Sequence, residues 1–276
     1  YFTPRHVIRM AVKMLNPKPN EYVIDPACGS GGFLMETMRW VWESYLADKT
    51  ENKKVEYAKT FLYGIDFEEM MHKISRALMT IAGDGASHIF RLNSLDTKSW
   101  FEETEEKLFA RRELSKFLHE FEDYKQNEEN RKTFRYFDFD ILLTNPPFAG
   151  EIHDPFLIRE YELTKNKKGD YSDKVERDLL FIERVLQFIK PGGRLAIVLP
   201  QGKLNNTNTE YIRRWFLEKG RILAVVGLHQ NTFKLPAPAK GTSTKTSILF
   251  FQKWNDNPNL GPLNLYQEDY PIFMAV

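Results

Sequence analysis

Residues 139–148, Phe-Asp-Ile-Leu-Leu-Thr-Asn-Pro-Pro-Phe, constrain the fold of this 276-residue chain more than any other stretch. Ile141, Leu142 and Leu143 form a short apolar run bounded by turn signals, which is typical of a strand buried on both faces. Strands of this kind belong to parallel sheets that carry helices on both sides. The two prolines after Asn145 end the strand, because neither has an N–H group to donate.

The turn after this strand is rich in hydrogen-bond acceptors. The prolines push Asn145 away from helical conformation and leave carbonyl groups free to accept. If the Asn145 side-chain oxygen and the Pro146 carbonyl each accept one hydrogen of an exocyclic amine, the nitrogen moves toward tetrahedral geometry and its lone pair points at an electrophile. Phe148 would stack on the attached ring. Taken alone, Asn-Pro-Pro is more commonly a plain strand-ending turn, so the rest of the chain must decide.

Residues 22–33 predict a strand, a glycine-rich turn and a helix, which is the corner where α/β proteins bind nucleotide-like ligands. Gly29, Gly31 and Gly32 let the backbone approach a ligand closely. Their spacing is not that of a dinucleotide fingerprint, and the lysine-serine pair of a phosphate loop is missing. We therefore expect a nucleoside with a non-phosphate tail. Cys28, the single cysteine, is expected to be a small buried residue rather than a nucleophile.

An acidic residue, Asp66, ends the next expected strand at residues 61–65. Its carboxylate can accept hydrogen bonds from both hydroxyls of a ribose, and it can equally cap the following helix. That helix is predicted to stop at Gly83. Its apolar residues recur at helical spacing: Phe67, Met70, Met71, Ile74, Ala77, Leu78 and Ile81.

The whole pattern predicts one α/β domain over residues 1–276. Thr3 followed by Pro4 indicates the N-cap of a first helix, with Val7, Ile8, Ala11, Val12 and Leu15 on its apolar face. Alternating strands and helices predict an open, twisted, mostly parallel sheet with helices on both faces and ligands at the carboxyl ends of its strands. We expect seven strands, the last one antiparallel, at residues 22–24, 61–65, 88–92, 139–144, 194–200, 221–228 and 247–252.

Three charged segments connect these elements. Residues 44–60 are interpreted as a helix end and a solvated connection, and residues 151–177 as a mobile polar loop. Residues 97–135 have helical periodicity and are interpreted as a peripheral inserted helical pair without chemistry of its own.

The formal charge of +1 lacks the basic excess of a protein that grips nucleic acid unaided, so a chain that acts on a polynucleotide needs help. No apolar run has membrane-spanning length and no signal peptide opens the chain, so we expect a cytoplasmic protein without a membrane partner. One cysteine and six scattered histidines predict no metal site. Because the chain starts at Tyr1 rather than methionine, we expect flanking regions of a longer protein to be missing.

Four motifs resemble, in order, those of the adenine-specific DNA methyltransferases, and within them the modification subunit of type I restriction-modification systems. They are Tyr-Phe-Thr-Pro-Arg at 1–5, Asp-Pro-Ala-Cys-Gly-Ser-Gly-Gly-Phe at 25–33, Asn-Pro-Pro-Phe at 145–148 and Thr-Lys-Thr-Ser-Ile-Leu-Phe-Phe at 244–251. The resemblance covers nearly the whole chain. It implies the S-adenosylmethionine-dependent methyltransferase fold, S-adenosylmethionine as cofactor and double-stranded DNA as substrate. The implied partners are a specificity (S) subunit and, for restriction, an R subunit.

The resemblance also implies roles for single residues. The catalytic set is Asn145, Pro146, Pro147 and Phe148, acting on an adenine flipped out of the duplex, with Phe233 against the opposite face of the base. Asp66 would hold the cofactor ribose, Asp25 would order the loop near its methionyl ammonium, and Asn93 stands where the family often has an acid near its adenine. The implied cofactor-binding residues are Tyr1, Phe2, Thr3, Pro4, Arg5, Asp25, Ala27, Gly29, Ser30, Gly31, Gly32, Phe33, Asp66, Phe67, Asn93 and Ser94.

Two other interpretations stay open. The same acceptor turn serves methyltransferases that act on an RNA base or on a protein glutamine. A non-catalytic assembly subunit with the same fold is the third possibility, although an intact turn and an intact glycine corner argue against it. The DNA target sequence cannot be predicted, because residues that would read bases in the grooves are not evident in this chain.

Overall fold

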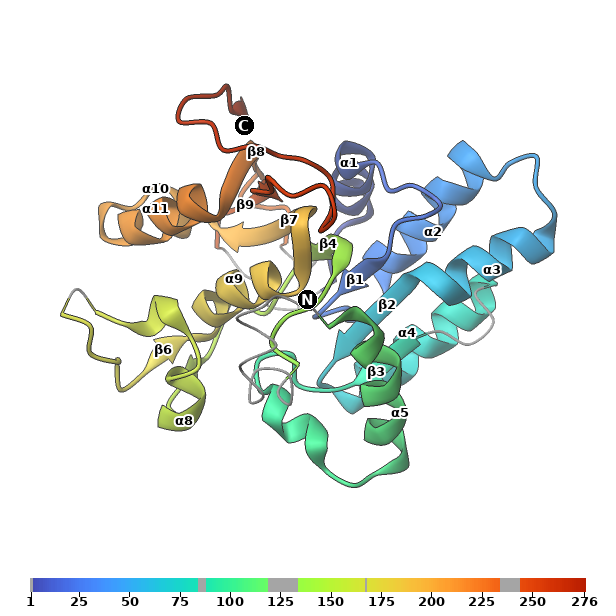
Figure 1. Ribbon diagram of the computed structural model, residues 1–276, viewed down its shortest axis with the longest axis horizontal. Helices are drawn as coiled ribbons and strands as arrows, with labels where there is room; N and C mark the ends of the chain where they lie inside the picture. The colour runs from blue at the N-terminus through green and yellow to red at the C-terminus, as the bar shows by residue number, and fades with distance from the viewer. Residues whose placement is uncertain (1, 84–87, 119–133, 167, 234–243) are drawn as a thin grey trace.

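A computed structural model describes residues 2–83, 88–118, 134–166, 168–233 and 244–276, and a twisted sheet of eight strands forms its centre (Figure 1). Strands β5 and β6 pair separately as a small antiparallel sheet. The strands are β1 (Val23–Asp25), β2 (Leu62–Asp66), β3 (His88–Arg91), β4 (Phe139–Thr144), β5 (Glu151–Ile152), β6 (Val175–Glu176), β7 (Ile189–Pro200), β8 (Gly220–Gly227), β9 (Thr246–Lys253) and β10 (Phe273–Ala275).

Helices cover both faces of the central sheet, as predicted for an α/β fold (Figure 1). The α-helices are α1 (Arg5–Leu15), α2 (Gly32–Tyr45), α3 (Glu51–Phe61), α4 (Glu69–Ala82), α5 (Glu105–Leu114), α8 (Pro155–Ile158), α9 (Arg177–Gln187), α10 (Gln201–Asn205) and α11 (Glu210–Lys219). Short 3-10 helices are η1 (Thr97–Phe101), η2 (Ser115–Phe117), η3 (Glu162–Thr164) and η4 (Thr207–Thr209). None of the described helices has the length and apolar character needed to cross a membrane.

The order of the central strands is β10-β8-β9-β7-β4-β1-β2-β3. All neighbours are parallel except β9, which runs antiparallel to both β7 and β8. The predicted sheet is therefore confirmed, with one more strand than expected. The extra strand, β10, has three residues and lies at the edge of the sheet, where Phe273 and Met274 stay exposed.

Strands β1 and β4 lie side by side although they are far apart in the sequence: Val23 of β1 pairs with Ile141 of β4. From β1 the chain goes outward to β2 and β3, and from β4 it goes the other way to β7. The strand order thus reverses between β1 and β4. In open α/β sheets such a switch point leaves a crevice outside the carboxyl ends of the strands, where ligands bind.

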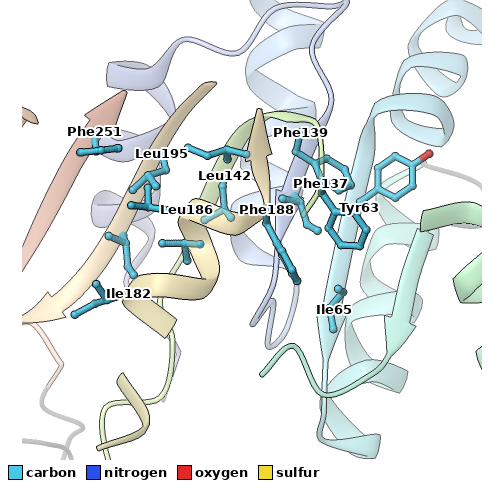
Figure 2. Packing of buried hydrophobic residues seen from close by; sticks show 14 of the residues in the cluster. Tyr63, Ile65, Phe137, Phe139, Leu142, Ile182, Leu186, Phe188, Leu195 and Phe251 are labelled. Atoms are coloured by element: carbon cyan, nitrogen blue, oxygen red, sulfur yellow. The ribbon is translucent and has the colours of Figure 1, made fainter. Parts of the chain in front are cut away.

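Alternate residues of each strand belong to two separate apolar cores. In β9, Ile248 and Phe250 face the core that α1 and α2 cover, while Leu249 and Phe251 face the core that α9 and α11 cover. Figure 2 shows Phe251, Leu195 and Leu142 of three strands against Ile182 and Leu186 of α9. The predicted inward face of α1 is confirmed, since all five of its apolar residues are buried.

Helix α4 packs with the opposite face from the one that its sequence suggests. Its buried residues are His72, Ser75 and Met79. A hydrogen bond joins His72 Nε2 to the Ile89 carbonyl at 3.1 Å. Most of the apolar face is exposed, with Ile81 81% accessible. The buried face carries Ser75 and Met79, which lie beside Gly31 of the turn after β1.

The charged segment after β3 contributes to the main core. Trp100 in η1 is fully buried, and its Nε1 donates to the Asn93 carbonyl at 2.8 Å. Ala110 and Leu114 of α5 and Phe117 of η2 belong to the same core. The predicted second helix of the pair falls largely on residues 119–133, outside the described residues. The described part is not peripheral, because its apolar side chains fill space beside β3 and β4.

Residues 151–166 and 168–177 form short strands and helices rather than the predicted polar loop. Strands β5 and β6, α8 and η3 enclose an apolar cluster of Leu95, Ile158, Tyr161, Val175, Leu180 and Phe181. The fully buried Arg184 of α9 donates to the Tyr161 hydroxyl and to the Leu95 carbonyl. Partners so distant in sequence leave no local pattern. Residues 44–60 likewise contain a separate helix, α3, which buries only Tyr57 and Ala58.

Candidate functional site

A cavity of about 890 Å³ lies at the carboxyl ends of β1 to β4, at the predicted position. Tyr1 is outside the described residues, and Gly31 does not line the cavity. All other residues predicted for the site line it: Phe2, Thr3, Pro4, Arg5, Asp25, Ala27, Gly29, Ser30, Gly32, Phe33, Asp66, Phe67, Asn93, Ser94, Asn145, Pro146, Pro147, Phe148 and Phe233. Residues from six separate segments of the sequence therefore meet in one space, and three of the four motifs are among them.

The glycines of the turn after β1 have different tasks. Gly29 has φ +53°, and no described atom lies within 4 Å of the position that a Cβ would occupy there. The backbone at Gly29 is therefore open to a ligand. Gly31 has φ +80° and is the N-cap of α2, but its missing Cβ would point at Ser75 and Met79 of α4. These would be ordinary contact distances, so the need for glycine at position 31 comes from its left-handed backbone conformation.

Asp66 connects the glycine turn to the start of α4. Its Oδ2 accepts from Gly29 N at 2.8 Å, and its Oδ1 accepts from Glu68 N at 2.9 Å. The N-cap position itself belongs to Glu68. A carboxylate has about four lone-pair sites, so two remain for the hydroxyl groups of a ligand. Partial burial raises the pKa of Asp66 above its ordinary value, which is typical of a group at a functional site.

Asp25, at the end of β1, is almost completely buried in the floor of the cavity. Its Oδ1 accepts from Ala27 N at 3.1 Å and so shapes the turn that follows. Burial raises the pKa of this carboxyl to about 7, and the nearby charge of Asp66 adds to the effect. A positive group of a ligand beside Asp25 would favour the carboxylate and lower that pKa.

The raised pKa of Asp25 predicts a measurable pH dependence of stability. In the unfolded chain this group loses its proton near pH 4, whereas in the folded chain it does so only near pH 7. The free energy of unfolding should therefore fall by up to about 1.4 kcal/mol per pH unit as the pH rises between these values. Urea unfolding of the wild type and of Asp25→Asn at several pH values tests this. The free energy of unfolding of the wild type minus that of Asp25→Asn should fall as the pH rises to about 7 and then stay constant. Parallel pH curves for the two proteins would contradict the prediction.

The residues after β3 form the end of the cavity beside Asp66. Ser94 Oγ donates to the Pro26 carbonyl at 2.6 Å and so joins this loop to the glycine turn. The Asn93 side-chain oxygen accepts from Leu95 N at 3.1 Å. Asn93 lines the cavity, and with one lone pair of its oxygen engaged it can still offer its amide nitrogen as a donor and the second lone pair as an acceptor. It can therefore bind either a ring nitrogen or an amine of a ligand.

At the other end of the cavity, Asn145 is held by the lead-in to α1. Asn145 Nδ2 donates to Thr3 Oγ1 at 2.9 Å. The predicted N-cap role of Thr3 is wrong: the cap position of α1 is Pro4, whose carbonyl accepts from Val7 N and Ile8 N, and no side chain caps the helix. Asn145 Oδ1 is buried and has no hydrogen-bond partner among the described residues. An unpartnered buried acceptor indicates a position that a ligand donor completes.

Two aromatic rings lie beside the Asn-Pro-Pro turn. The ring centroids of Phe148 and Phe233 are 6.4 Å apart, and the ring planes are nearly perpendicular at 88°. The two rings do not form a parallel slot in this arrangement, so a base stacked on Phe148 would meet Phe233 only after one ring turns.

Sequence reasoning missed several residues that line the cavity. Arg177, at the start of α9, comes close to Gly150 and lines the cavity beside Phe148. Met71 and Leu78 reach it from α4, because the apolar face of that helix points this way. The helical spacing of Met71 and Leu78 was visible in the sequence, whereas nothing local distinguishes Arg177 from other surface arginines.

The sequence predicted neither a nucleophilic cysteine nor a metal site. Cys28 is buried, and burial raises the pKa of its thiol well above the ordinary value. It is thus the small packed residue that we predicted and not a nucleophile. Over the part of the chain that the structure describes, no cluster of three or more His, Cys, Asp or Glu side chains could hold a metal ion.

Comparison with known proteins gives a clear sequence match. The profile of one protein family, described as N-6 DNA methylase, matches residues 1–270. The type I restriction enzyme EcoEI methylase subunit of Escherichia coli is 25% identical over 275 residues. That alignment covers 98% of this chain but 45% of the relative, so the chain spans less than half the length of that protein.

Solved structures show the same fold. The M protein of the type I restriction enzyme EcoKI, from Escherichia coli strain K12, has a TM-score of 0.61 and 22% identity, covering 94% of this chain and 45% of its own. A nuclease-deletion mutant of the Type ISP restriction-modification enzyme LlaGI, in complex with a DNA substrate mimic, has a TM-score of 0.64 and 16% identity, covering 94% and 23%.

Proposed function

Because this chain belongs to the N-6 DNA methylase family, we propose that it transfers a methyl group from S-adenosylmethionine to the exocyclic amine of an adenine in DNA. One observation carries the proposal. A single cavity combines a nucleoside seat, made by the turn at Gly29 and by Asp66, with the unpartnered acceptor Asn145 Oδ1. A methyl donor and an amine to be methylated need these two features within reach of each other.

The residues at the glycine turn fit S-adenosylmethionine. When bound, this cofactor supplies the electrophilic methyl group of its sulfonium. Asp66 has lone pairs left for the ribose hydroxyls, and the Asn93 amide nitrogen is placed to donate to a nitrogen of the adenine ring. Asp25 carries the negative charge that a methionyl ammonium needs. The opening left at Gly29 gives the cofactor access to the backbone.

The residues after β4 hold the amine that is methylated. Asn145 Oδ1 and the Pro146 carbonyl each accept one amine hydrogen, so the nitrogen lone pair is freed from the ring and directed at the methyl group. Pro147 fixes the turn, Phe148 stacks on the base, and Phe233 covers the opposite face of the base once one of the two rings has turned. No strong base is required, because the methylated nitrogen is cationic and releases its proton readily. Positioning and charge complementarity carry the rate.

An adenine inside a duplex cannot reach this cavity, so the base must be flipped out of the helix. With a formal charge of +1, the chain has no net basic excess with which to grip DNA by itself. We therefore infer that it acts as the modification part of a type I restriction-modification system. A specificity (S) subunit reads the DNA target, an R subunit joins for restriction, and the assembly works in the cytoplasm, where the DNA is.

A methyl-transfer assay with three acceptors tests the proposal. The full-length protein, assembled with its specificity subunit, is incubated with labelled S-adenosylmethionine and with duplex DNA, RNA or protein. We expect label in DNA, recovered as N6-methyladenine after digestion. Label found only in RNA or on protein glutamine would overturn the choice of substrate. No transfer to any acceptor, with the cofactor still bound, would identify a non-catalytic assembly subunit instead.

A further inference from the structure

The contact between Thr3 and Asn145 has no explanation in helix capping or in apolar packing. The two residues are 142 positions apart, and Asn145 Nδ2 donates to Thr3 Oγ1 at 2.9 Å. Thr3 lies one residue before the cap position of α1, and its side chain accepts no bond from that helix. The hydroxyl is therefore free to act on the residue opposite.

In the structure this bond anchors the donor end of the Asn145 amide. A carboxamide has one donor end and one acceptor end, and turning it by half a circle exchanges them. With Nδ2 on Thr3, the oxygen is the end left without a partner among the described residues. The opposite orientation would present an NH2 group to an incoming amine, and two donors cannot form a hydrogen bond.

The backbone around Asn145 does not settle this choice by itself. The following Pro146 restricts the main chain of Asn145, but it does not restrict rotation about the last side-chain bond. Outside the bond to Thr3, no described residue is hydrogen-bonded to the Asn145 side chain. The Thr3 hydroxyl is thus the described group that anchors this amide, and with Nδ2 bonded to it the turn offers an acceptor.

We propose that Thr3 is a positioning residue for methyl transfer: its hydroxyl holds the Asn145 amide so that Oδ1 faces the amine that is methylated. The proposal rests on the proposed function and goes beyond it, because it assigns the Thr3 side chain an action on the target side of the cavity rather than on the cofactor. In this arrangement the lead-in to α1 completes the acceptor turn after β4.

Two substitutions separate the hydroxyl from the shape of the side chain. Thr3→Val keeps the shape and removes the acceptor, which leaves Asn145 Nδ2 without a partner. Thr3→Ser keeps the hydroxyl. Thr3 is half-buried and lies outside every helix and strand, so both variants should fold, and circular dichroism checks this. We expect Thr3→Val to lower kcat about 10- to 100-fold, the effect of one lost buried hydrogen bond. Thr3→Ser should stay within about threefold of wild type.

Cofactor binding and a double variant give readouts that a general structural role would not produce. The Kd for S-adenosylmethionine, measured by calorimetry, should change by a much smaller factor than kcat in Thr3→Val. In an Asn145→Ala background, Thr3→Val should cause no further loss, because the amide on which it acts is gone. Losses that multiply in the double variant, or a loss that lies entirely in cofactor affinity, would overturn the assignment.

The outcomes also distinguish this assignment from the proposed function. If wild type methylates DNA and Thr3→Val has the wild-type kcat, the role of Thr3 is refuted while the function stands. If wild type transfers no methyl group to DNA, the function fails and the assignment fails with it.

Discussion

Asn145→Ala will lower the rate of methyl transfer to DNA by about 100- to 1000-fold, the cost of removing one preorganised polar contact to the reacting group. The variant lacks the acceptor that frees the amine lone pair, while the cofactor end of the cavity keeps all its residues. We therefore expect kcat to fall and the Kd for S-adenosylmethionine to change little. Single-turnover transfer of labelled methyl groups into duplex DNA measures the first quantity, and calorimetry measures the second.

Asn259→Ala is a matched control for this experiment. Asn259 is exposed in a turn near the end of the chain, remote in sequence from the cavity residues. The Asn259→Ala variant should methylate DNA at the wild-type rate. Transfer by Asn145→Ala within threefold of wild type would show that the turn after β4 does not activate the amine, and the proposed function would lose its main support.

Trp100→Ala will have the largest effect on stability. The side chain is fully buried, its ring lies against Phe137 with centroids 6.2 Å apart, and its N–H group holds the Asn93 carbonyl. Removing it leaves a large cavity and an unpartnered carbonyl. We expect the free energy of unfolding to fall by about 3–5 kcal/mol, and Tm by roughly 10 °C. Urea titration and calorimetry provide the two values.

Two further variants define what Trp100 contributes. Trp100→Phe keeps a ring but loses the bond to Asn93, and about 1–2 kcal/mol of stability should be lost. Leu108→Ala changes a residue of α5 that is 45% exposed, so less than about 1 kcal/mol should be lost. If Trp100→Ala unfolds at the wild-type urea concentration, the segment after β3 is as peripheral as its charge suggests.

The strands and the turns that follow them were predictable from sequence because both signals are local. Ile141 to Leu143 is apolar without interruption, and the prolines after Asn145 mark its end. The same holds for the glycine turn after β1 and for Asp66 after β2. Since the strands are parallel, these ends meet at one edge of the sheet, so the position of the cavity followed as well.

Other features depend on contacts between distant residues and could not be predicted. The spacing of apolar residues in α4 identifies a helix, but the buried face is the one that carries Ser75 and Met79 and lies beside Gly31. The apolar cluster around Tyr161 is bonded to Arg184, which comes from the following helix. Thr3 has the sequence of a helix cap, yet its hydroxyl is bonded to a residue in the middle of the chain.

The pairing of β1 with β4 has a consequence for how the protein is made. Tyr22 N donates to Asp140 Oδ2 across 118 residues, and no nearer segment can take the place of either strand. Contacts of such high sequence separation form late in folding, because the long intervening chain must first be ordered. While the ribosome has not yet released residue 144, the emerging polypeptide has a glycine turn but no acceptor turn beside it. The protein therefore has no functional cavity until more than half of this chain has been synthesised.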